Sequence, residues 1–143
     1  MKIHVYDRQK DLPLSKLSAI NLARSVLDCL KIDCKELSLY FVSEKKITEL
    51  HTEFFDDPTP TDCISFPLDQ EHLGEIFVCP KAAIRYVQKK KGSPYIETSL
   101  YVVHGLLHLL GFDDLEPKKK EAMRKKEKRC MAHLERTNTL LHA

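Results

Sequence analysis

The chain has 143 residues, of which 43% are apolar and 31% are charged, and its formal net charge is +2. This length and composition predict one soluble domain, residues 1–143, with its own hydrophobic core. The N-terminal segment 1–10 is too charged for a signal peptide, and the most apolar stretch, 99–112, is shorter than a membrane span. Neither a secreted nor a membrane-spanning protein is therefore expected, and a cytoplasmic protein is.

The first half of the chain predicts alternating strands and helices. Residues 2–6 and 37–41 alternate between apolar and polar side chains, which is typical of strands. A second helix is expected over 44–54, capped by Ser43, with Ile47 and Leu50 facing inward. The first helix is expected to begin at Pro13, with a buried face made by Leu14, Leu17, Ile20, Ala23, Leu27 and Leu30.

The second half predicts two short strands, over 63–66 and 75–79, and three helices. Each helix begins at a proline, and Gly92 and Gly111 end the first two of them. Several helices with few short strands predict an α+β fold, in which a small mixed β-sheet packs against the helices. The three predicted helices run from Pro80 to about Lys91, from Pro94 to Leu110, and from Pro117 to about Arg136.

The cysteines and the distribution of charge add two expectations. The five cysteines are odd in number and include no Cys-x-x-Cys pair, so neither a disulfide framework nor a thiolate zinc site is expected. Residues 1–75 hold 9 Lys or Arg against 14 Asp or Glu, and residues 76–143 hold 14 against 7. A basic C-terminal half favours an anionic partner, most commonly a nucleic acid. Buried, reduced thiols are predicted for Cys29, Cys34, Cys63, Cys79 and Cys130.

The most informative motif lies at the end of the fourth predicted helix. His104 and His108 are four residues apart, so they share one helix face and can hold one metal ion. Gly111 ends the helix and lets the chain turn back, which allows Asp114 to supply a third ligand. Three protein ligands leave a fourth position open for water, which is the pattern of a catalytic Zn²⁺ site.

Two points about this motif stay open at the level of sequence. The ligand spacing is that of the metzincin zinc peptidases, but those enzymes carry Glu directly after the first His, and this chain has Gly105. A peptidase is therefore disfavoured relative to other metal-dependent hydrolases. Asp113 and Glu116 could replace Asp114 as the ligand, and Asp113 could instead contact a ligand histidine from outside the metal shell.

At these residues the sequence resembles the YbeY family, bacterial endoribonucleases of rRNA maturation. The family signature is similar to His-Gly-x-Leu-His-Leu-x-Gly-Tyr/Phe-Asp-His, and residues 104–114 read HGLLHLLGFDD. Two further blocks resemble the family, PTDCISFP at 60–67 and LGEI at 73–76. The resemblance implies an α+β fold with a metal cleft between helix and sheet, Zn²⁺, RNA as the substrate, and a role at the ribosome, including its quality control.

The chain departs from the family pattern at two positions. Asp114 stands where the family has its third histidine, and a carboxylate is also a legitimate Zn²⁺ ligand. Phe55 stands where the family has an arginine that engages phosphate or the reacting centre. Arg85 or Lys81 would have to supply that cation instead.

The expected chemistry is metal-assisted cleavage of RNA phosphodiesters. The strand edge around Ser65 is a candidate surface for an extended substrate. The basic residues of 81–91 and 118–129 are candidates for phosphate contacts, although Glu121 and Glu127 can also pair with them on a solvated helix face. The alternatives are a weakly active or non-catalytic ribosome assembly factor with a bound zinc, which Phe55 favours, and a metallopeptidase.

Overall fold

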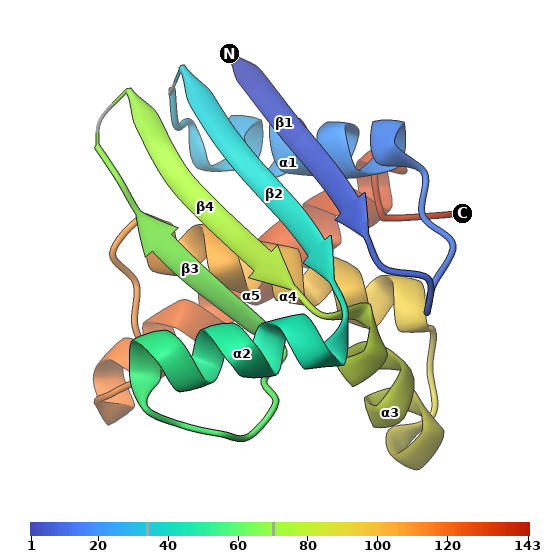
Figure 1. Cartoon of the computed structure of the whole chain (residues 1–143). Helices are drawn as coiled ribbons and strands as arrows, with labels where there is room; N and C mark the ends of the chain where they lie inside the picture. Colours follow the sequence, from blue (N-terminus) through green and yellow to red (C-terminus); the bar gives the residue numbers. More distant parts are fainter. Residues whose placement is uncertain (34, 70) are drawn as a thin grey trace.

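In the computed structural model, which describes residues 1–33, 35–69 and 71–143, the chain forms a mixed β-sheet and five helices (Figure 1). The predicted α+β fold is confirmed. The elements follow in the order β1 (Lys2–Arg8), α1 (Lys16–Leu30), β2 (Glu36–Val42), α2 (Glu44–Phe55), β3 (Cys63–Pro67), β4 (His72–Val78), α3 (Pro80–Lys90), α4 (Pro94–Leu109) and α5 (Pro117–Thr137).

The four strands lie in the order β1-β2-β4-β3, which places β3 at one edge of the sheet. β1, β2 and β4 pair in parallel, and β3 pairs antiparallel with β4. Figure 1 shows α1, α4 and α5 behind the sheet and α2 in front of it, beside β3, in agreement with the contacts of these elements. β3 therefore has a helix on each side and its outer edge free of the sheet.

The buried face of α1 differs from the predicted one. Ala23 and Leu27 are buried as expected, but Leu17 is 64% exposed, and Leu22 and Val26 fill the core instead. Side chains separated by repeated steps of three residues drift round a helix, because each residue turns it by about 100°. Leu17 consequently lies roughly 120° away from Ala23. In α2 the predicted inward side chains and the Ser43 cap are confirmed.

The thiols divide into two groups. Among the described residues, Cys79 and Cys130 are buried as predicted, whereas Cys29 and Cys63 are only partly buried, and all four are free. The prediction for Cys34 lies outside the described residues. Within residues 1–33, 35–69 and 71–143, no helix combines the length and the apolar content needed to cross a bilayer.

Candidate metal centre

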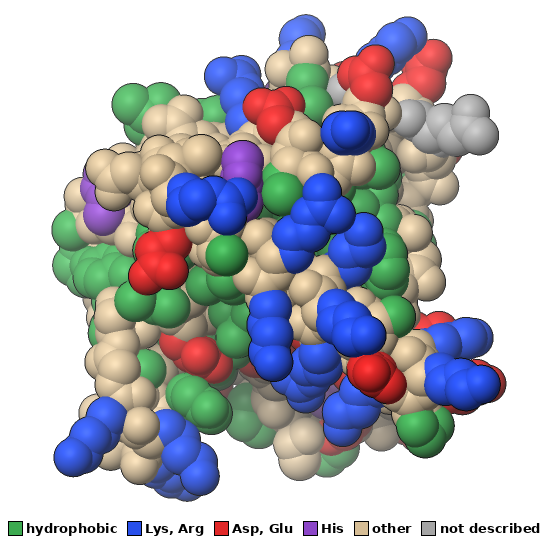
Figure 2. All heavy atoms as spheres, turned by 180° about the vertical axis from the view of Figure 1, so that it is seen from behind, with side chains coloured by type: hydrophobic (Ala, Val, Ile, Leu, Met, Phe, Trp, Pro, Cys, Tyr) green, Lys and Arg blue, Asp and Glu red, His purple; other side chains and the backbone are tan. Residues whose placement is uncertain are grey.

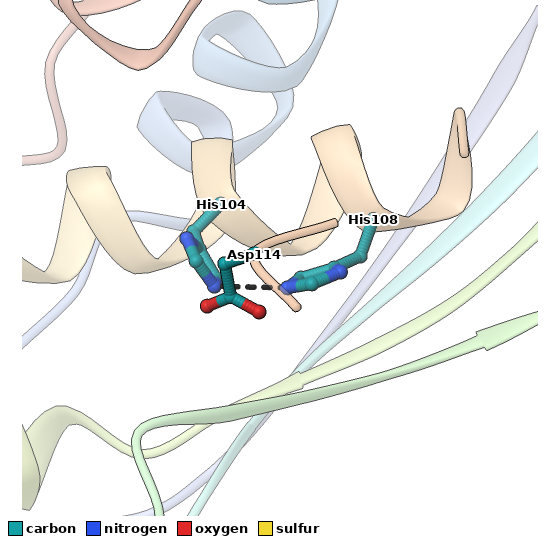
Figure 3. Close-up of side chains that lie close together, drawn as sticks. All are labelled: His104, His108 and Asp114. Atoms are coloured by element: carbon teal, nitrogen blue, oxygen red, sulfur yellow. Dashed lines mark hydrogen bonds between the residues drawn. The ribbon is translucent and has the colours of Figure 1, made fainter. Parts of the chain in front are cut away.

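Helix α4 positions the two histidines. It packs against β3, β4, α3 and α5, and its side chains at Val102, Val103 and Leu106 are fully buried. His104 and His108 lie on the remaining face, partly buried, with their ring centroids 4.6 Å apart. Their Nε2 atoms face one another at 3.0 Å (Figure 3). The four-residue spacing thus brings two imidazole nitrogens to one point.

The chain turns back after α4 as the glycine predicts. Gly111 has φ +96°, a left-handed conformation that favours glycine. Asp114 then lies beside the two histidines, and one ligand atom from each of the three residues lies within 4.8 Å of the others (Figure 3). Zn²⁺ bonds of about 2.0–2.1 Å place tetrahedral ligand atoms roughly 3.4 Å apart, so a small side-chain adjustment would complete the shell. The donor set of two imidazoles and one carboxylate fits Zn²⁺.

The two neighbouring acids take other positions. Asp113 Oδ1 accepts a hydrogen bond from the Leu115 N–H at 3.1 Å, and its Oδ2 lies 3.7 Å from Lys119 Nζ. Glu116 is the N-cap residue of α5. Of the three acids near the end of α4, the metal-ligand geometry therefore includes Asp114.

A buried glutamate from α5 lies behind His104. Glu127 Oε2 is 3.5 Å from His104 Nδ1, and Glu127 is only 4% exposed. Among the described residues, no group hydrogen-bonds to Glu127 Oε1. A carboxylate at Nδ1 favours the tautomer with its proton there, which leaves the Nε2 lone pair directed toward His108 and Asp114. The arrangement is that of a carboxylate orienting a metal-ligating histidine.

The alternative in which Glu127 pairs with basic residues on a solvated helix face is wrong for this residue, because Glu127 is buried. Glu127 belongs to the buried face of α5, together with Met123, Cys130 and Leu134. The spacing of these four residues is helical, so the sequence did carry a signal for its burial. A lone acid within an apolar helical stripe requires a partner, and here the partner is His104.

The two imidazoles titrate differently. The contact with Glu127 raises the pKa of His104 above its usual value, and burial opposes that effect. Burial lowers the pKa of His108, and the neighbouring charge of His104 lowers it further. Both effects favour the neutral form of His108, which is the form that binds a metal.

A cavity of about 580 Å³ opens over the histidines. Asp114 and Ser65 line it, as does Arg124 from α5. Lys81 and Arg85 are not among the described residues around it. Arg85 instead donates two hydrogen bonds to the Glu44 carboxylate, at 2.9 and 3.1 Å, which connect α3 to α2.

Gly105 sets the distance between α4 and the sheet. A Cβ atom added there would lie 2.6 Å from Ile76 Cγ2. Ser65 Oγ on β3 also donates a hydrogen bond to the Gly105 carbonyl at 2.8 Å. This close approach holds the edge strand directly beside the histidines.

Comparison with known proteins adds a family to this geometry. A family model described as endoribonuclease YbeY matches residues 4–135. A Protochlamydia amoebophila protein named endoribonuclease YbeY is 44% identical, with 94% of this chain and 93% of that protein covered. A Chlamydia felis protein of the same name is 38% identical, over 99% and 96% of the two chains.

A solved structure agrees with the fold. The solution structure of TM1509 from Thermotoga maritima superimposes with a TM-score of 0.69 and 28% sequence identity, covering 96% of this chain and 93% of that chain. Sequence and structure thus agree over nearly the whole length. The chain belongs to the endoribonuclease YbeY family.

Proposed function

We propose that residues 1–143 form one metal-dependent endoribonuclease domain that cleaves single-stranded RNA in rRNA maturation and ribosome quality control in the cytoplasm. The observation that carries the proposal is the convergence of His104, His108 and Asp114 at an open cavity. The names of the relatives support RNA as the substrate. Ribosomal RNA, with the ribosome or its proteins, is the proposed partner.

His104, His108 and Asp114 would hold one Zn²⁺ ion. When bound there, Zn²⁺ would supply Lewis-acid chemistry toward the phosphodiester and would lower the pKa of water. Glu127 keeps the His104 Nδ1 proton in place and so orients the ring. The buried carboxylate also adds negative charge behind the metal shell, which favours a bound cation.

Arg124 is the proposed contact for the RNA phosphate. Its side chain lines the same cavity as the three ligands, whereas Arg85 is paired with Glu44. Figure 2 shows Lys and Arg side chains gathered on the face seen from behind, where α5 lies. A basic surface of this kind attracts the RNA backbone without reading its sequence. Ser65, on the cavity side of the edge strand, remains a candidate for contact with the substrate.

The first test is the metal content of purified protein, measured by mass spectrometry for the wild type and for Asp114→Ala. We expect near-stoichiometric zinc in the wild type and a sharp loss in the variant. RNA cleavage should then be present in the wild type and absent in His108→Ala. A wild type that retains no metal after zinc is supplied and the excess removed would refute the hydrolase mechanism.

One observation favours a second candidate, a ribosome assembly factor with weak or no catalysis. Phe55 is exposed where the family resemblance places an arginine, and Arg85 is held by Glu44. In that case the wild type would bind ribosomes without cleaving RNA. Ribosome binding that survives His108→Ala without RNA cleavage would support this candidate.

A further inference from the structure

A second cavity of about 330 Å³ adjoins the candidate metal centre. Three residues, Cys63, Ser65 and His108, line both cavities, so the two spaces meet at a histidine ligand. The far wall of the second cavity comes from α2, through His51 and Phe55. Cavities of roughly 300–1,000 Å³ are large enough to hold small-molecule ligands.

Phe55 presents an aromatic ring to this cavity. It is 55% exposed, and its nearest aromatic neighbours are His51 at 5.7 Å and Phe66 at 6.5 Å between centroids, both tilted to it. Phe55 is the last residue of α2. The next residue, Asp56, adopts a left-handed conformation and turns the chain away from the helix. A large part of the Phe55 side chain is therefore available to a flat ligand.

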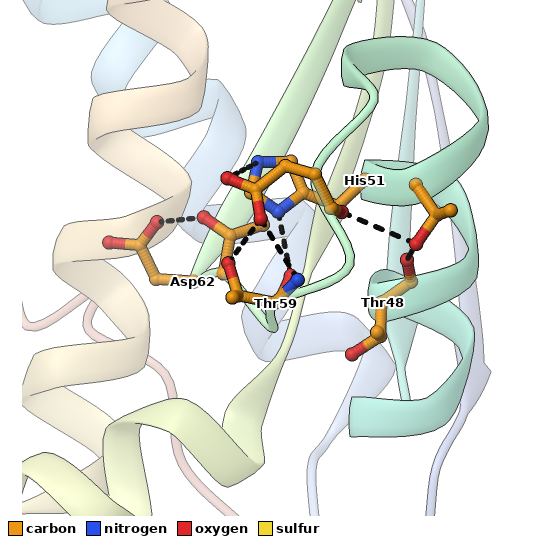
Figure 4. Close-up of polar contacts among 7 residues, drawn as sticks. Thr48, His51, Thr59 and Asp62 are labelled. Atoms are coloured by element: carbon orange, nitrogen blue, oxygen red, sulfur yellow. Dashed lines mark hydrogen bonds and ion pairs between the residues drawn. The ribbon is translucent and has the colours of Figure 1, made fainter.

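His51 is fixed by its own contacts (Figure 4). Its Nδ1 donates to the Thr59 carbonyl at 2.7 Å, and its Nε2 lies 3.8 Å from Asp57 Oδ2. Asp57 in turn accepts hydrogen bonds from the N–H and the hydroxyl of Thr59. This network connects the loop after α2 to the helix, beside the cavity between α2 and β3.

The lining of the second cavity favours a neutral ligand over a phosphate. Among the described residues that line it, none is Lys, Arg, Asp or Glu. Its apolar walls stand beside the outer edge of β3, which within the described chain pairs only with β4. A flat, neutral group with hydrogen-bonding edges matches an aromatic wall next to a free strand edge.

We infer that this second cavity binds a nucleobase of unpaired RNA, stacked on Phe55, beside the phosphate held at the metal centre. The inference rests on the proposed function, because a base can enter this cavity only when the same RNA is bound at the neighbouring metal centre. Stacking of a base on an aromatic side chain tolerates any base, so Phe55 would select for single-stranded RNA and not for a sequence. Phe55 thus acts as a substrate-binding residue in this chain.

The test is a double-substitution cycle on protein and RNA. The substrates are short single-stranded RNAs, each with one abasic nucleotide at a different position. The value of kcat/KM is measured for each RNA with the zinc-loaded protein. The variants are Phe55→Ala, Phe55→Tyr, which keeps the stack, and Phe54→Ala as the matched control. Phe54 is 56% exposed on the same helix, but its ring packs edge-on against Phe66 outside the cavity lining.

We expect an abasic nucleotide at one position near the cleaved bond to lower kcat/KM roughly tenfold in the wild type, Phe55→Tyr and Phe54→Ala. In Phe55→Ala the intact RNA should be cleaved about tenfold more slowly, with no further loss from the abasic nucleotide. Equal abasic effects in Phe55→Ala and the wild type would overturn the inference while leaving the nuclease intact.

Two other outcomes would also overturn the inference. If the wild type cleaves no RNA, the proposed function fails and the nucleobase site fails with it. If Phe55→Ala leaves RNA cleavage unchanged but weakens binding to ribosomes, the cavity receives an apolar side chain of a protein partner. Thermal unfolding of each variant checks that the exposed substitutions leave the fold intact.

Discussion

Replacing Glu127 with glutamine should weaken zinc binding without unfolding the protein. The substitution keeps the volume of a side chain that is 4% exposed, and it keeps one acceptor oxygen near His104 Nδ1. It removes the negative charge that strengthens this contact and makes His104 a better donor to a cation. The affected quantity is the free energy of metal binding.

The magnitude follows from the geometry. Hydrogen bonds to charged groups contribute about 1.5–3 kcal/mol net, and loss of a carboxylate behind a ligand histidine lowers metal affinity about 10- to 100-fold. The Nδ1 to Oε2 distance of 3.5 Å is longer than in a strong charge-assisted hydrogen bond. We therefore expect the lower end of this range, which is a roughly tenfold loss of zinc affinity, or about 1.4 kcal/mol in binding free energy.

The assay is competition for Zn²⁺ with a chromophoric chelator at fixed pH. Glu121→Gln is the matched control, since Glu121 lies on the same helix and pairs with Lys125 at 3.6 Å on an exposed surface. The control should bind zinc like the wild type. If Glu127→Gln binds zinc as tightly as the wild type, Glu127 does not orient His104. An equal loss of zinc affinity in Glu127→Gln and Glu121→Gln would point to a general charge effect.

Three further perturbations test the packing, the loop and the basic helix. Gly105→Ala should lower the free energy of unfolding by about 1–2 kcal/mol in a urea titration, because overpacking against the sheet outweighs the gain in helix propensity; unchanged stability would mean that α4 can move away. Hydrogen bonds from Thr59 lower the pKa of the Asp57 carboxyl group in the folded protein. The ionised Asp57 therefore stabilises the fold above the usual carboxyl pKa, and this stabilisation is lost as the pH falls through the folded-state pKa. Asp57→Asn should accordingly lower Tm at pH 7 but not at strongly acidic pH, and a pH-independent difference would contradict this. Arg124→Ala should slow RNA cleavage and reduce its dependence on salt more than Arg129→Ala, an exposed arginine on the same helix outside the cavity lining; equal effects would assign the role to overall charge.

The sequence predicts the parts of the site that are local in the chain. One helix and its end contain the four-residue spacing of His104 and His108 and the break at Gly111. The relative positions of these residues therefore follow from their spacing in the sequence. The starts of α2, α3, α4 and α5 follow for the same reason, since caps and prolines act on adjacent residues, whereas α1 begins at Lys16 and not at Pro13, and β4 spans His72–Val78 and not 75–79. The fold class needs only the order of these elements.

The rest of the site depends on contacts between distant segments. Glu127 contacts His104 only because α5 packs across α4. Arg85 forms an ion pair with Glu44 because α3 lies near α2. The sequence shows these residues as members of charged helices and gives no pairing. The cavity beside Phe55 likewise arises from the approach of α2 to the outer edge of β3.

The close contact at Gly105 also bears on how this scaffold can change over evolution. The ligand spacing matches a peptidase pattern, but that pattern also requires a glutamate directly after the first histidine, where this chain has Gly105. That glutamate would have to enter a space where even a Cβ atom lies 2.6 Å from Ile76 Cγ2. A glutamate introduced at position 105 alone would therefore press against Ile76, and a smaller residue at position 76 would relieve that contact.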